Sequence, residues 1–552
     1  MLNLNLKYVD EYFDSEGKLK DYKFKYPDNF NFAYDVVDEI AKAEPDRKAM
    51  VWCNPKGEEH IFTYGDLKYY SDKTANMLRQ KGVNKGDMVM VILKRHYQFW
   101  FVILALHKLG AVIIPATFLL TAHDVVYRAN ASGTKAVICT GEGDVAAHID
   151  EALPECPDVK IKIMVNGKRD GWDEFMPEME AAASEFNRIP TKVDEPMILY
   201  FSSGTTGNPK MALHNYTYAI GHMATAKYWQ NVGPESLHCT IADTGWGKAV
   251  WGKLYGQMMM EACVFTYDMD KFVPAEILGL LEKYKITSLC CPPTMFRFLM
   301  QEDVASYDLS SLKYCTIAGE ALSPDVFNKW YEYTGVKLME GFGQTETTVM
   351  IANIIGSKPK PGSMGKPVPH YDIDIVDEDG KSVSPGVTGE VVIRTDKRNP
   401  EGLFVCYYRD EKRTNEAWHD DIYHTGDTAW MDEDGYFWYV GRTDDVIKSS
   451  GYRIGPFEIE SVLVEHPAVL ECAVTGVPDE LRGNLVKATI VLKSNYTPSE
   501  ALKKELQEFV KKATAPYKYP RVIEFVSELP KTVNGKIRRV AIRENDTKPA
   551  TE

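Results

Sequence analysis

The chain has 552 residues, with 64 Lys plus Arg against 79 Asp plus Glu, so its net charge is −15. This length excludes a single small binding module and leaves room for three or four structural units of about 150 residues each. The acidic balance argues against a protein that coats nucleic acid through its overall charge. Hydrophobic residues make up 44% and charged residues 26%, which is typical of a globular chain and not of a disordered one.

The beginning of the chain turns acidic within ten residues and lacks the basic start and apolar stretch of a signal peptide. The most apolar run, residues 99–116, is interrupted by His107 and Lys108. We interpret it as a buried helix, a turn at Gly110 and a strand, and not as a membrane span. Ten cysteines without any CxxC pair indicate neither a zinc site nor disulfides. We therefore expect reduced thiols, no integral membrane segment and a cytoplasmic location.

Helix-like and strand-like patterns alternate through the first two thirds of the chain. Residues 64–81 and 99–109 carry apolar side chains at helical spacing, whereas residues 88–93 and 135–140 are apolar runs typical of buried strands. This alternation favours parallel sheets covered by helices.

The pattern changes near Gly356, where short strands separated by Gly and Pro begin. DEDG turns at 377–380 and 432–435 predict a small β-rich subdomain, about residues 356–443. A further unit begins near Asp444. Its predicted helices span 456–465 and 499–513, and its predicted strands span 468–477, 486–492 and 521–526. We therefore expect an α/β fold with a large N-terminal domain (1–443) and a small α+β C-terminal domain (444–552).

The sharpest local signal is SSGTTGNPK, which follows the apolar run MILYF. Its glycines allow a tight turn and a close approach of the backbone to an anion. Its hydroxyls and backbone N–H groups can bind phosphate oxygens. It is not a Walker A loop, because no Gly-Lys-Ser/Thr follows Gly204 at the required spacing, and a polar surface turn remains the alternative. The candidate phosphate-binding residues are Ser202, Ser203, Gly204, Thr205, Thr206, Gly207 and Lys210.

This motif resembles the signature of the adenylate-forming superfamily, which contains acyl-CoA synthetases, peptide-synthetase adenylation domains and luciferases. Other motifs follow in the order of that family: AGE (318–320), EGFGQTET (340–347), YHTGD (423–427), GRTDD (441–445), GYRIG (451–455) and PKTVNGK (530–536). The segments KMALHN, IADTGW, SSGYRIGP and TAPYKYPR are most similar to the medium-chain acyl-CoA synthetase branch. The resemblance covers nearly the whole chain and implies the fold of that family, with a mobile C-terminal domain.

Enzymes of this family join a carboxylate to ATP with release of pyrophosphate, and then transfer the acyl group to coenzyme A with release of AMP. A carboxylate attacks a phosphate against charge repulsion, so catalysis should depend on positioning and cationic stabilisation. The resemblance assigns Glu346 to Mg²⁺, Thr345 to the α-phosphate, and Asp427 with Arg442 to the ribose. Without it, these charges would be interpreted as ordinary surface residues. The other residues that it assigns to ATP or AMP are Gly319, Glu320, Ala321, Glu340, Gly341, Phe342, Gly343 and Gln344.

The resemblance also implies that Lys536 bridges the carboxylate and the α-phosphate during adenylation. Asp444 would be the hinge about which the small domain rotates between the two half-reactions, and Arg453 would then lie near the reacting centre. The alternatives are a surface lysine in a basic run for Lys536 and a turn cap for Asp444. The candidate coenzyme A residues are Ser450, Gly451, Tyr452, Arg482, Lys511, Tyr519 and Arg521. Leu119 departs from the branch, which can carry a polar residue there to meet the pantetheine arm.

Gly343 bears on the size of the acid. Acetate-specific relatives place a bulky Trp just before Gln-Thr-Glu, so glycine should admit a larger acid, although Gly343 could serve only the turn. Trp246, Lys248 and Trp251 are candidates for the pocket wall, with the last two on one face of a helix. We expect a pocket of intermediate depth for short-to-medium-chain, branched or cyclic acids. The alternative is that Trp251 belongs to the core and Lys248 points to solvent.

Three other functions are compatible with parts of the sequence. A peptide-synthetase module would usually continue into a carrier domain, but 16 residues follow Lys536 (552 − 536) and the FDxS pattern of such modules is missing. A luciferase-like oxidation or another non-coenzyme A acceptor is a second possibility. A non-catalytic nucleotide-binding protein is the third, although Lys536, Glu346, Thr345 and Asp427 are all intact. We expect only small-molecule partners and a monomer or homodimer.

Overall fold

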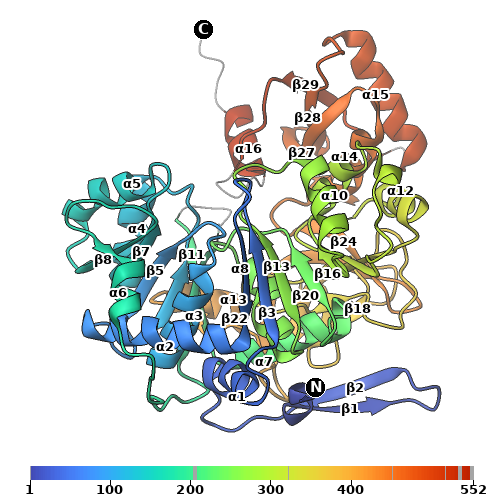
Figure 1. Ribbon diagram of the computed structural model, residues 1–552. Helices are drawn as coiled ribbons and strands as arrows, with labels where there is room; N and C mark the ends of the chain where they lie inside the picture. The colour runs from blue at the N-terminus through green and yellow to red at the C-terminus, as the bar shows by residue number, and fades with distance from the viewer. Residues whose placement is uncertain are drawn as a thin grey trace.

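The computed structural model describes residues 2–202, 208–320, 322–450, 452–515, 517–531 and 537–547. Two large sheets form the body, the first on the left and the second on the right of Figure 1, and a small C-terminal domain lies above the second. The architecture is therefore α/β with a small C-terminal domain, as the sequence predicts.

The first sheet has eight strands in the order β21-β11-β10-β6-β5-β7-β8-β9. Its central strands are parallel, whereas β11 and β21 run antiparallel at one edge. The strands are β5 (Met88–Ile92), β6 (Val112–Pro115), β7 (Thr134–Thr140), β8 (Ile161–Val165), β9 (Asp173–Glu174), β10 (Pro196–Ser202), β11 (Lys210–Asn215) and β21 (Cys406–Tyr407).

The second sheet has nine strands in the order β18-β17-β16-β15-β14-β12-β13-β3-β4. Here too the centre is parallel and the strands at both edges are antiparallel. Both sheets are thus mixed and not purely parallel. Short connections place β11, β17 and β4 antiparallel beside the strand the chain has just left, whereas β21 joins β11 from far along the chain. The strands are β3 (Lys48–Cys53), β4 (Glu59–Thr63), β12 (Leu237–Thr240), β13 (Cys263–Tyr267), β14 (Ser288–Cys290), β15 (Tyr314–Ile317), β16 (Leu338–Phe342), β17 (Ile351–Ala352) and β18 (Lys366–Pro367).

Helices cover these sheets, and α3 is the most deeply buried of them. All twelve residues of α3 are buried, as expected for a helix that is apolar on every side, and it ends at Gly110 with φ 72°. The helices of the large domain are α1 (Glu39–Ala43), α2 (Tyr64–Gln80), α3 (Gln98–Leu109), α4 (Ala122–Ser132), α5 (Val145–Ala152), α6 (Phe175–Ala181), α7 (Thr217–Met223), α8 (Gly247–Lys253), α9 (Tyr255–Met259), α10 (Pro274–Lys283), α11 (Pro293–Leu299), α12 (Pro324–Thr334) and α13 (Glu411–Ala417). Two π-helical segments, η2 (Ala33–Asp38) and η4 (Ala224–Trp229), and three short 3₁₀ turns, η1 (Leu4–Lys7), η3 (Leu153–Glu155) and η5 (Val304–Ser306), complete the set.

The predicted β-rich region forms an antiparallel sheet in which β23 pairs with β24 through a DEDG turn. Its strands are β19 (Asp372–Val376), β20 (Gly389–Arg394), β22 (Trp418–His419), β23 (Ile422–Met431) and β24 (Phe437–Arg442). The small domain has its own apolar cluster around a three-stranded sheet. Its elements are β25 (Ile447–Ser449), β26 (Tyr452–Ile454), α14 (Pro456–Glu465), β27 (Val469–Asp479), β28 (Gly483–Leu492), α15 (Glu500–Ala513), β29 (Val522–Val526) and α16 (Arg539–Thr547).

The N-terminal residues contain an element that the sequence patterns do not predict. Strands β1 (Val9–Phe13) and β2 (Leu19–Phe24) form an antiparallel hairpin that projects at the bottom of the molecule in Figure 1. Charged residues alternate irregularly with aromatic ones in both strands, so no period-2 apolar pattern marks them.

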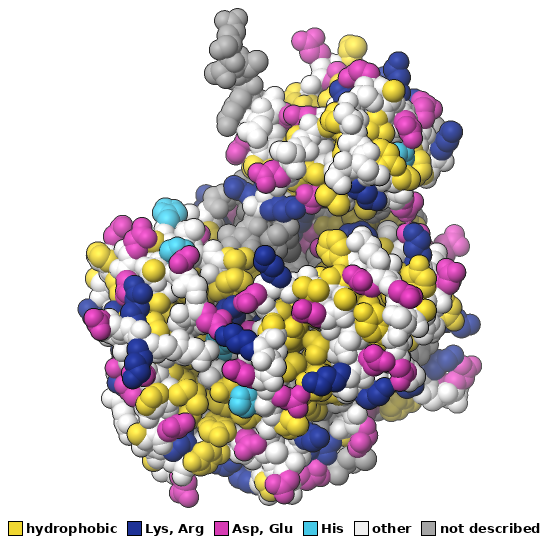
Figure 2. Space-filling model, turned by 45° about the horizontal axis from the view of Figure 1, so that its top comes forward, with side chains coloured by type: hydrophobic (Ala, Val, Ile, Leu, Met, Phe, Trp, Pro, Cys, Tyr) yellow, Lys and Arg dark blue, Asp and Glu magenta, His cyan; other side chains and the backbone are white. Residues whose placement is uncertain are grey.

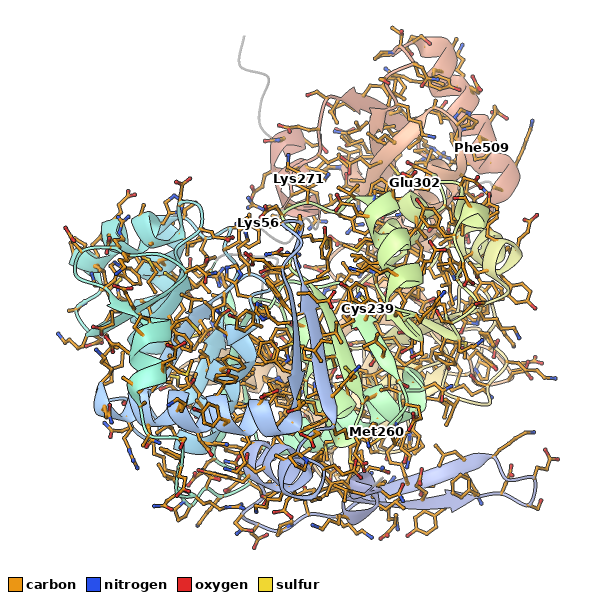
Figure 3. All side chains as sticks on the ribbon, in the orientation of Figure 1. Lys56, Cys239, Met260, Lys271, Glu302 and Phe509 are labelled. Carbon is orange, nitrogen blue, oxygen red and sulfur yellow. The ribbon has the colours of Figure 1, made fainter. Side chains whose placement is uncertain are left out.

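Side-chain placement agrees with the expectation of free thiols. All ten cysteines are free, and Cys239 lies inside the large domain in Figure 3, where Phe509 marks the small one. Acidic and basic side chains are interspersed over the face shown in Figure 2. Over the described part of the chain, no helix combines the length and apolarity needed to cross a membrane.

Candidate active site

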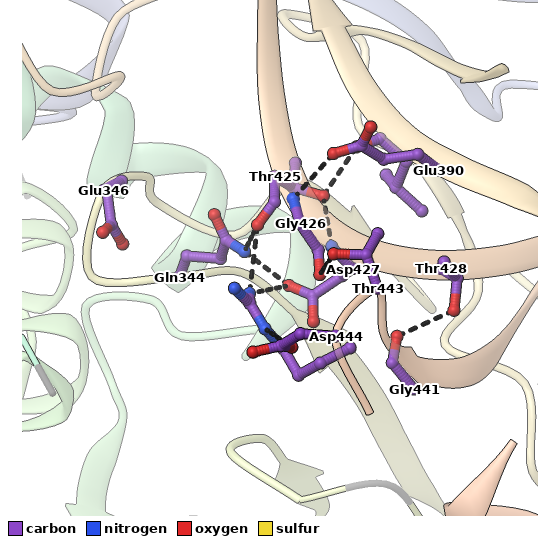
Figure 4. A network of polar contacts seen from close by, with 12 residues as sticks. Gln344, Glu346, Glu390, Thr425, Gly426, Asp427, Thr428, Gly441, Thr443 and Asp444 are labelled. Carbon is purple, nitrogen blue, oxygen red and sulfur yellow. Dashed lines mark hydrogen bonds and ion pairs between the residues drawn. The ribbon is translucent and has the colours of Figure 1, made fainter. Parts of the chain in front are cut away.

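A carboxylate on β23 is the centre of a network of polar contacts (Figure 4). Asp427 is 4% exposed. Its Oδ1 accepts from Tyr439 Oη at 3.1 Å, and its Oδ2 accepts from Gln344 Nε2 and from Arg442 Nη1, the latter at 3.3 Å. The antiparallel register of β23 and β24 sets Arg442 directly opposite Asp427, which explains how two residues fifteen positions apart come together. The Asp427 carboxylate thus accepts hydrogen bonds from three side chains.

Gln344 connects this network to the strand that carries the EGFGQTE motif. Its Nε2 also donates to the carbonyl of Thr425 at 2.8 Å, and its Oε1 accepts from Tyr423 Oη at 2.9 Å. Both ends of the amide are therefore committed, which fixes its orientation.

Glu346 lies two residues further on and is 8% exposed. Tyr407 Oη donates to its Oε1 at 2.8 Å, and the Phe404 N–H donates to its backbone carbonyl at 2.8 Å. Lys210 Nζ lies 4.9 Å from the centre of the Tyr407 ring. Burial lowers the pKa of Lys210, although the nearby carboxylate of Glu346 opposes that shift. A cation, a phenol and a carboxylate thus meet where β11 begins, directly after the phosphate-binding motif.

The adenine-side candidates follow β15 and lie on β16. Glu320 Oε2 accepts from Thr294 Oγ1 at 2.6 Å, whereas Glu340 is 4% exposed with its Oε2 unpaired. Burial raises the pKa of Glu340 to about 8, against the opposing effect of the Leu322 N–H. The Glu340 carboxyl is therefore protonated in the folded protein at neutral pH.

This protonation predicts a pH dependence of stability. Glutamate has a reference pKa of 4.5, so between pH 4.5 and about 8 the folded state holds one more proton than the unfolded state. The free energy of unfolding should then fall as pH rises, by up to about 1.4 kcal/mol per pH unit. Urea unfolding from pH 5 to 8.5 should show this slope in the wild type and a flatter profile in Glu340→Gln.

Asp243→Asn is the matched control for that experiment. Burial raises the pKa of Asp243 to about 6, so this variant should change the profile below pH 6 and leave the slope between pH 6 and 8 in place. Parallel profiles for wild type and Glu340→Gln above pH 6 would contradict the assignment.

The space beside the Cα of Gly343 is filled by the side chain of a residue from another part of the chain. A Cβ on Gly343 would lie 2.5 Å from Trp251 Cη2 and 2.4 Å from the carbonyl oxygen of Thr348. Trp251 is 7% exposed and donates from Nε1 to Tyr218 Oη at 3.0 Å. Trp251 of α8 therefore occupies the space beside Gly343.

The other two predicted wall residues are on the same helix or at its start. Trp246 is the residue before α8. Lys248 Nζ donates to the carbonyl of Ala318 at 2.8 Å, so this side chain points to the end of β15 and not to solvent.

The predicted coenzyme A residues form two groups in the small domain. Arg482 Nη1 donates to Ser450 Oγ at 3.2 Å. Lys511 and Arg521 lie over the ring of Tyr519, at 4.3 and 4.6 Å from its centre. Tyr452 is 50% exposed and is stacked on Tyr517 with the ring centres 4.0 Å apart, an aromatic pair that the sequence analysis did not single out.

Asp444 contacts the network of Asp427, because Arg442 Nε lies 3.8 Å from Asp444 Oδ1. Several predicted site residues lie outside the described residues, and the side chain of Arg453 is likewise not described. These residues are Ser203, Gly204, Thr205, Thr206, Gly207, Ala321, Gly451 and Lys536.

Three tyrosines of the site escaped the sequence analysis. Tyr407, Tyr423 and Tyr439 donate to Glu346, Gln344 and Asp427, respectively. Tyr423 opens the YHTGD motif and was the only one with a local signal. Tyr439 lies on β24, which follows the predicted turn at 432–435, whereas Tyr407 lies on β21, whose pairing with β11 the sequence does not reveal.

Family comparisons agree with this geometry. The model of the AMP-binding enzyme family matches residues 37–408, and that of the AMP-binding enzyme C-terminal domain matches residues 458–536. The chain therefore belongs to the AMP-binding, adenylate-forming enzymes. Within that class it is an acyl-CoA synthetase of the medium-chain branch, a ligase that forms AMP, which confirms the predicted family and reaction class.

The relatives are similar over almost their whole length. The chain is 42% identical to the mitochondrial acyl-coenzyme A synthetase ACSM3 of Pongo abelii, over 97% of this chain and 92% of that protein. It is 44% identical to the mitochondrial acyl-coenzyme A synthetase ACSM4 of Homo sapiens, over 94% and 91%. These relatives point to the mitochondrion, so the predicted cytoplasmic location is wrong.

Solved structures share the fold. The anthranilate CoA ligase AuaEII in complex with anthranoyl-AMP has a TM-score of 0.86 at 28% identity, covering 94% of this chain and 98% of that one. A benzoate CoA ligase from Burkholderia xenovorans LB400 has a TM-score of 0.81 at 27% identity, covering 93% and 100%. ATP and coenzyme A as substrates fit this family.

Proposed function

We propose that this acyl-CoA synthetase activates a short-to-medium-chain, branched or cyclic carboxylic acid with ATP and Mg²⁺, and then passes the acyl group to coenzyme A. The observation that carries the proposal is the convergence of Gln344 and Glu346, from the loop that follows β16, with Asp427 of β23 and Arg442 of β24. Lys210 adds a further cation to this group.

In the adenylation step, Asp427 would accept hydrogen bonds from the ribose hydroxyls, as its ionised carboxylate can accept two. Lys210 and Arg442 would stabilise the negative charge that develops on the α-phosphate. The backbone of Thr345 is already held, because its carbonyl accepts from His214 Nε2 at 2.8 Å. Burial lowers the pKa of His214 to about 4, so this imidazole is neutral and donates through Nε2.

Glu346 fits a role in holding Mg²⁺. It offers a hard carboxylate oxygen, and Mg²⁺ is usually bound by one or two carboxylates together with substrate phosphates. The described residues contain no cluster of three His, Cys, Asp or Glu side chains that would enclose a metal without such phosphates. The ion would neutralise phosphate charge during the attack.

In the second step, rotation about Asp444 would bring the candidate coenzyme A residues to the large domain. Ser450, Arg482, Lys511 and Arg521 are suited to phosphate groups, and Lys536 would leave the reacting centre. The proposal includes the division into domains 1–443 and 444–552 and a monomeric or homodimeric state.

Pyrophosphate release with MgATP across an acid panel tests the proposal, with and without coenzyme A and with mass detection of the thioester. The panel contains acetate, isobutyrate, 2-methylbutyrate, hexanoate, cyclohexanecarboxylate, benzoate and palmitate. We expect coenzyme A-dependent turnover with the intermediate acids. Best turnover with acetate alone or with palmitate would contradict the acid class. Pyrophosphate without thioester would indicate another acceptor.

Trp251→Ala should change the acid preference. Removing an indole that fills the space beside Gly343 leaves room for additional methylenes, each worth about 1–3 kcal/mol in an apolar pocket. The ratio of kcat/KM for octanoate to that for butyrate should rise at least about tenfold.

Trp430→Ala is the control, since this indole lies on β23 and stacks on Trp438 outside the proposed pocket. The ratio of kcat/KM for octanoate to that for butyrate in this variant should equal that of the wild type. An unchanged ratio in a folded Trp251→Ala enzyme would show that Trp251 does not limit the acid.

A further inference from the structure

The N-terminal hairpin lies outside the segment that the AMP-binding family model matches, which begins at residue 37. One part of it is exposed, with Tyr12 at 46% and Phe13 at 57%, whereas Tyr22 of β2 is completely buried. One part of the hairpin therefore projects into solvent, and the other part packs against the body of the large domain.

One series of contacts leads from Tyr22 to the active-site loop. Tyr22 Oη is 2.8 Å from His370 Nδ1, and the His370 ring lies 4.2 Å from that of Tyr371. Tyr371 Oη accepts from the backbone N–H of Thr348 at 3.1 Å and is also 3.1 Å from Thr348 Oγ1. Thr348 is two residues beyond Glu346, so this series ends on the backbone of the proposed metal-binding loop.

The Thr348 backbone is further connected to the start of that loop. Thr347 Oγ1 donates to the carbonyl of Thr348 at 2.8 Å and accepts from the Gln344 N–H at 2.9 Å. A shift of Thr348 would therefore move Gln344 as well, because one hydroxyl bonds to both of their backbones.

A second series supports the strand that precedes the loop. Glu11 of β1 accepts from Tyr228 Oη and Lys227 Nζ, each at 2.9 Å, and the Tyr22 ring stacks on Tyr228 at 4.5 Å. The next residue, Trp229, donates from Nε1 to the carbonyl of Met339 at 3.0 Å. Its indole approaches β16 so closely that a Cβ on Gly341 would be 2.4 Å from it.

We infer that the N-terminal hairpin, through Tyr22, is a positioning element for the segment that carries Gln344 and Glu346. The two series of contacts support that segment at Met339 and at Thr348, on either side of the residues proposed to bind ATP and metal. A displacement of a fraction of an ångström in such groups lowers catalysis, since the reacting atoms must be held in near-attack geometry. The inference rests on the proposed function of this segment, because its effect is measured at the ATP site.

Tyr22→Phe tests the inference by removing one hydroxyl and leaving the ring that stacks on Tyr228. A neutral hydrogen bond contributes about 1 kcal/mol, so we expect the KM for ATP in ATP–pyrophosphate exchange to rise about threefold to tenfold. The rate of thioester formation from preformed acyl-adenylate and coenzyme A should stay within about twofold of the wild type, since that step needs neither ATP nor the metal. A purely structural role would not separate these two half-reactions.

Tyr12→Phe is the matched control, because it removes a hydroxyl from an exposed tyrosine of the same hairpin. It should behave as the wild type in both assays. Absence of coenzyme A-dependent turnover in wild type and Tyr12→Phe would reject the proposed function itself. Normal turnover in both, with an unchanged KM for ATP in Tyr22→Phe, would reject only the positioning role.

A double-mutant cycle with Tyr371→Phe tests whether the contacts act in series. If Tyr22 acts through Tyr371, the double variant should raise the KM for ATP no more than the stronger single variant does. If the increase in the KM for ATP in the double variant equals the product of the two single increases, Tyr22 does not act through Tyr371. Thermal unfolding of all four proteins identifies any variant that is simply unfolded, and a lowered midpoint with an unchanged KM also counts against the inference.

Discussion

Glu346→Gln is expected to lower kcat/KM for pyrophosphate formation by about 10²–10³, the usual scale for removing one preorganised electrostatic group from an active site. The amide keeps the size of the side chain, and its Oε1 can still accept from Tyr407 Oη. What it loses is the negative charge that a magnesium ion requires. The Mg²⁺ concentration needed for half-maximal rate should also rise, and transfer from preformed acyl-adenylate to coenzyme A should continue.

Glu416→Gln is the control for this prediction, because it makes the same change on the exposed surface of α13. Its pyrophosphate formation should equal that of the wild type at every Mg²⁺ concentration. If Glu346→Gln also kept the wild-type kcat/KM and Mg²⁺ dependence, Glu346 would not be the metal-binding group. Direct titration with Mn²⁺ in the presence of ATP gives a second measurement that does not depend on turnover.

Lys108→Met is expected to reduce the free energy of unfolding by about 3–5 kcal/mol, the cost of removing one partner from a buried group of paired charges. Lys108 of α3 has no exposed side-chain surface. Its Nζ lies 2.8 Å from Asp38 Oδ1 and 2.6 Å from Asp72 Oδ1, in η2 and α2. Without the ammonium, the two buried carboxylates remain close together, Asp38 loses its ion pair, and Asp72 keeps only the one with Lys68. Urea unfolding measures the loss.

The loss should depend on pH with a definite sign. Burial raises the pKa of Asp38 even beside Lys108. In the variant the folded state should bind a proton at Asp38 more readily than the unfolded state does, so stability falls as pH rises. The difference from wild type should therefore be smaller at pH 5 than at pH 8.

Two comparisons complete this test. Lys397→Met removes a cation whose partner Asp372 is also exposed, and it should cost less than about 1 kcal/mol. Lys108→Met combined with Asp38→Asn and Asp72→Asn should recover part of the loss, because no unpaired charge is then buried. A Lys108→Met variant whose free energy of unfolding falls by less than about 1 kcal/mol would contradict this explanation. A loss relative to wild type that is larger at pH 5 than at pH 8 would also contradict it.

Much of the fold can be predicted from local patterns. The apolar periodicity of residues 64–81 and 99–109 corresponds to α2 and α3, and the predicted helix at 456–465 corresponds to α14. Such segments are long and strongly periodic, so their pattern dominates over context. The edges of the sheets were less predictable, because antiparallel pairing at an edge depends on which strands become neighbours. The hairpin β1–β2 was missed for the same reason, since much of its surface is exposed and its burial comes from contacts with η4 and the loop at His370.

The sequence by itself determined the class of enzyme through the resemblance of its motifs to those of a known family, because such motifs are particular residues at short spacings that can be read along the linear chain. The same resemblance pointed to Asp427 and Arg442, which pair across a single hairpin. Only the tertiary structure decided which groups support them. Tyr407 reaches the site from β21, and Trp251 enters the space that Gly343 leaves open. Tyr22, more than 300 positions away, connects to the active-site loop through His370 and Tyr371. Those contacts join residues that no local pattern connects, since they follow from how the sheets and the hairpin pack together.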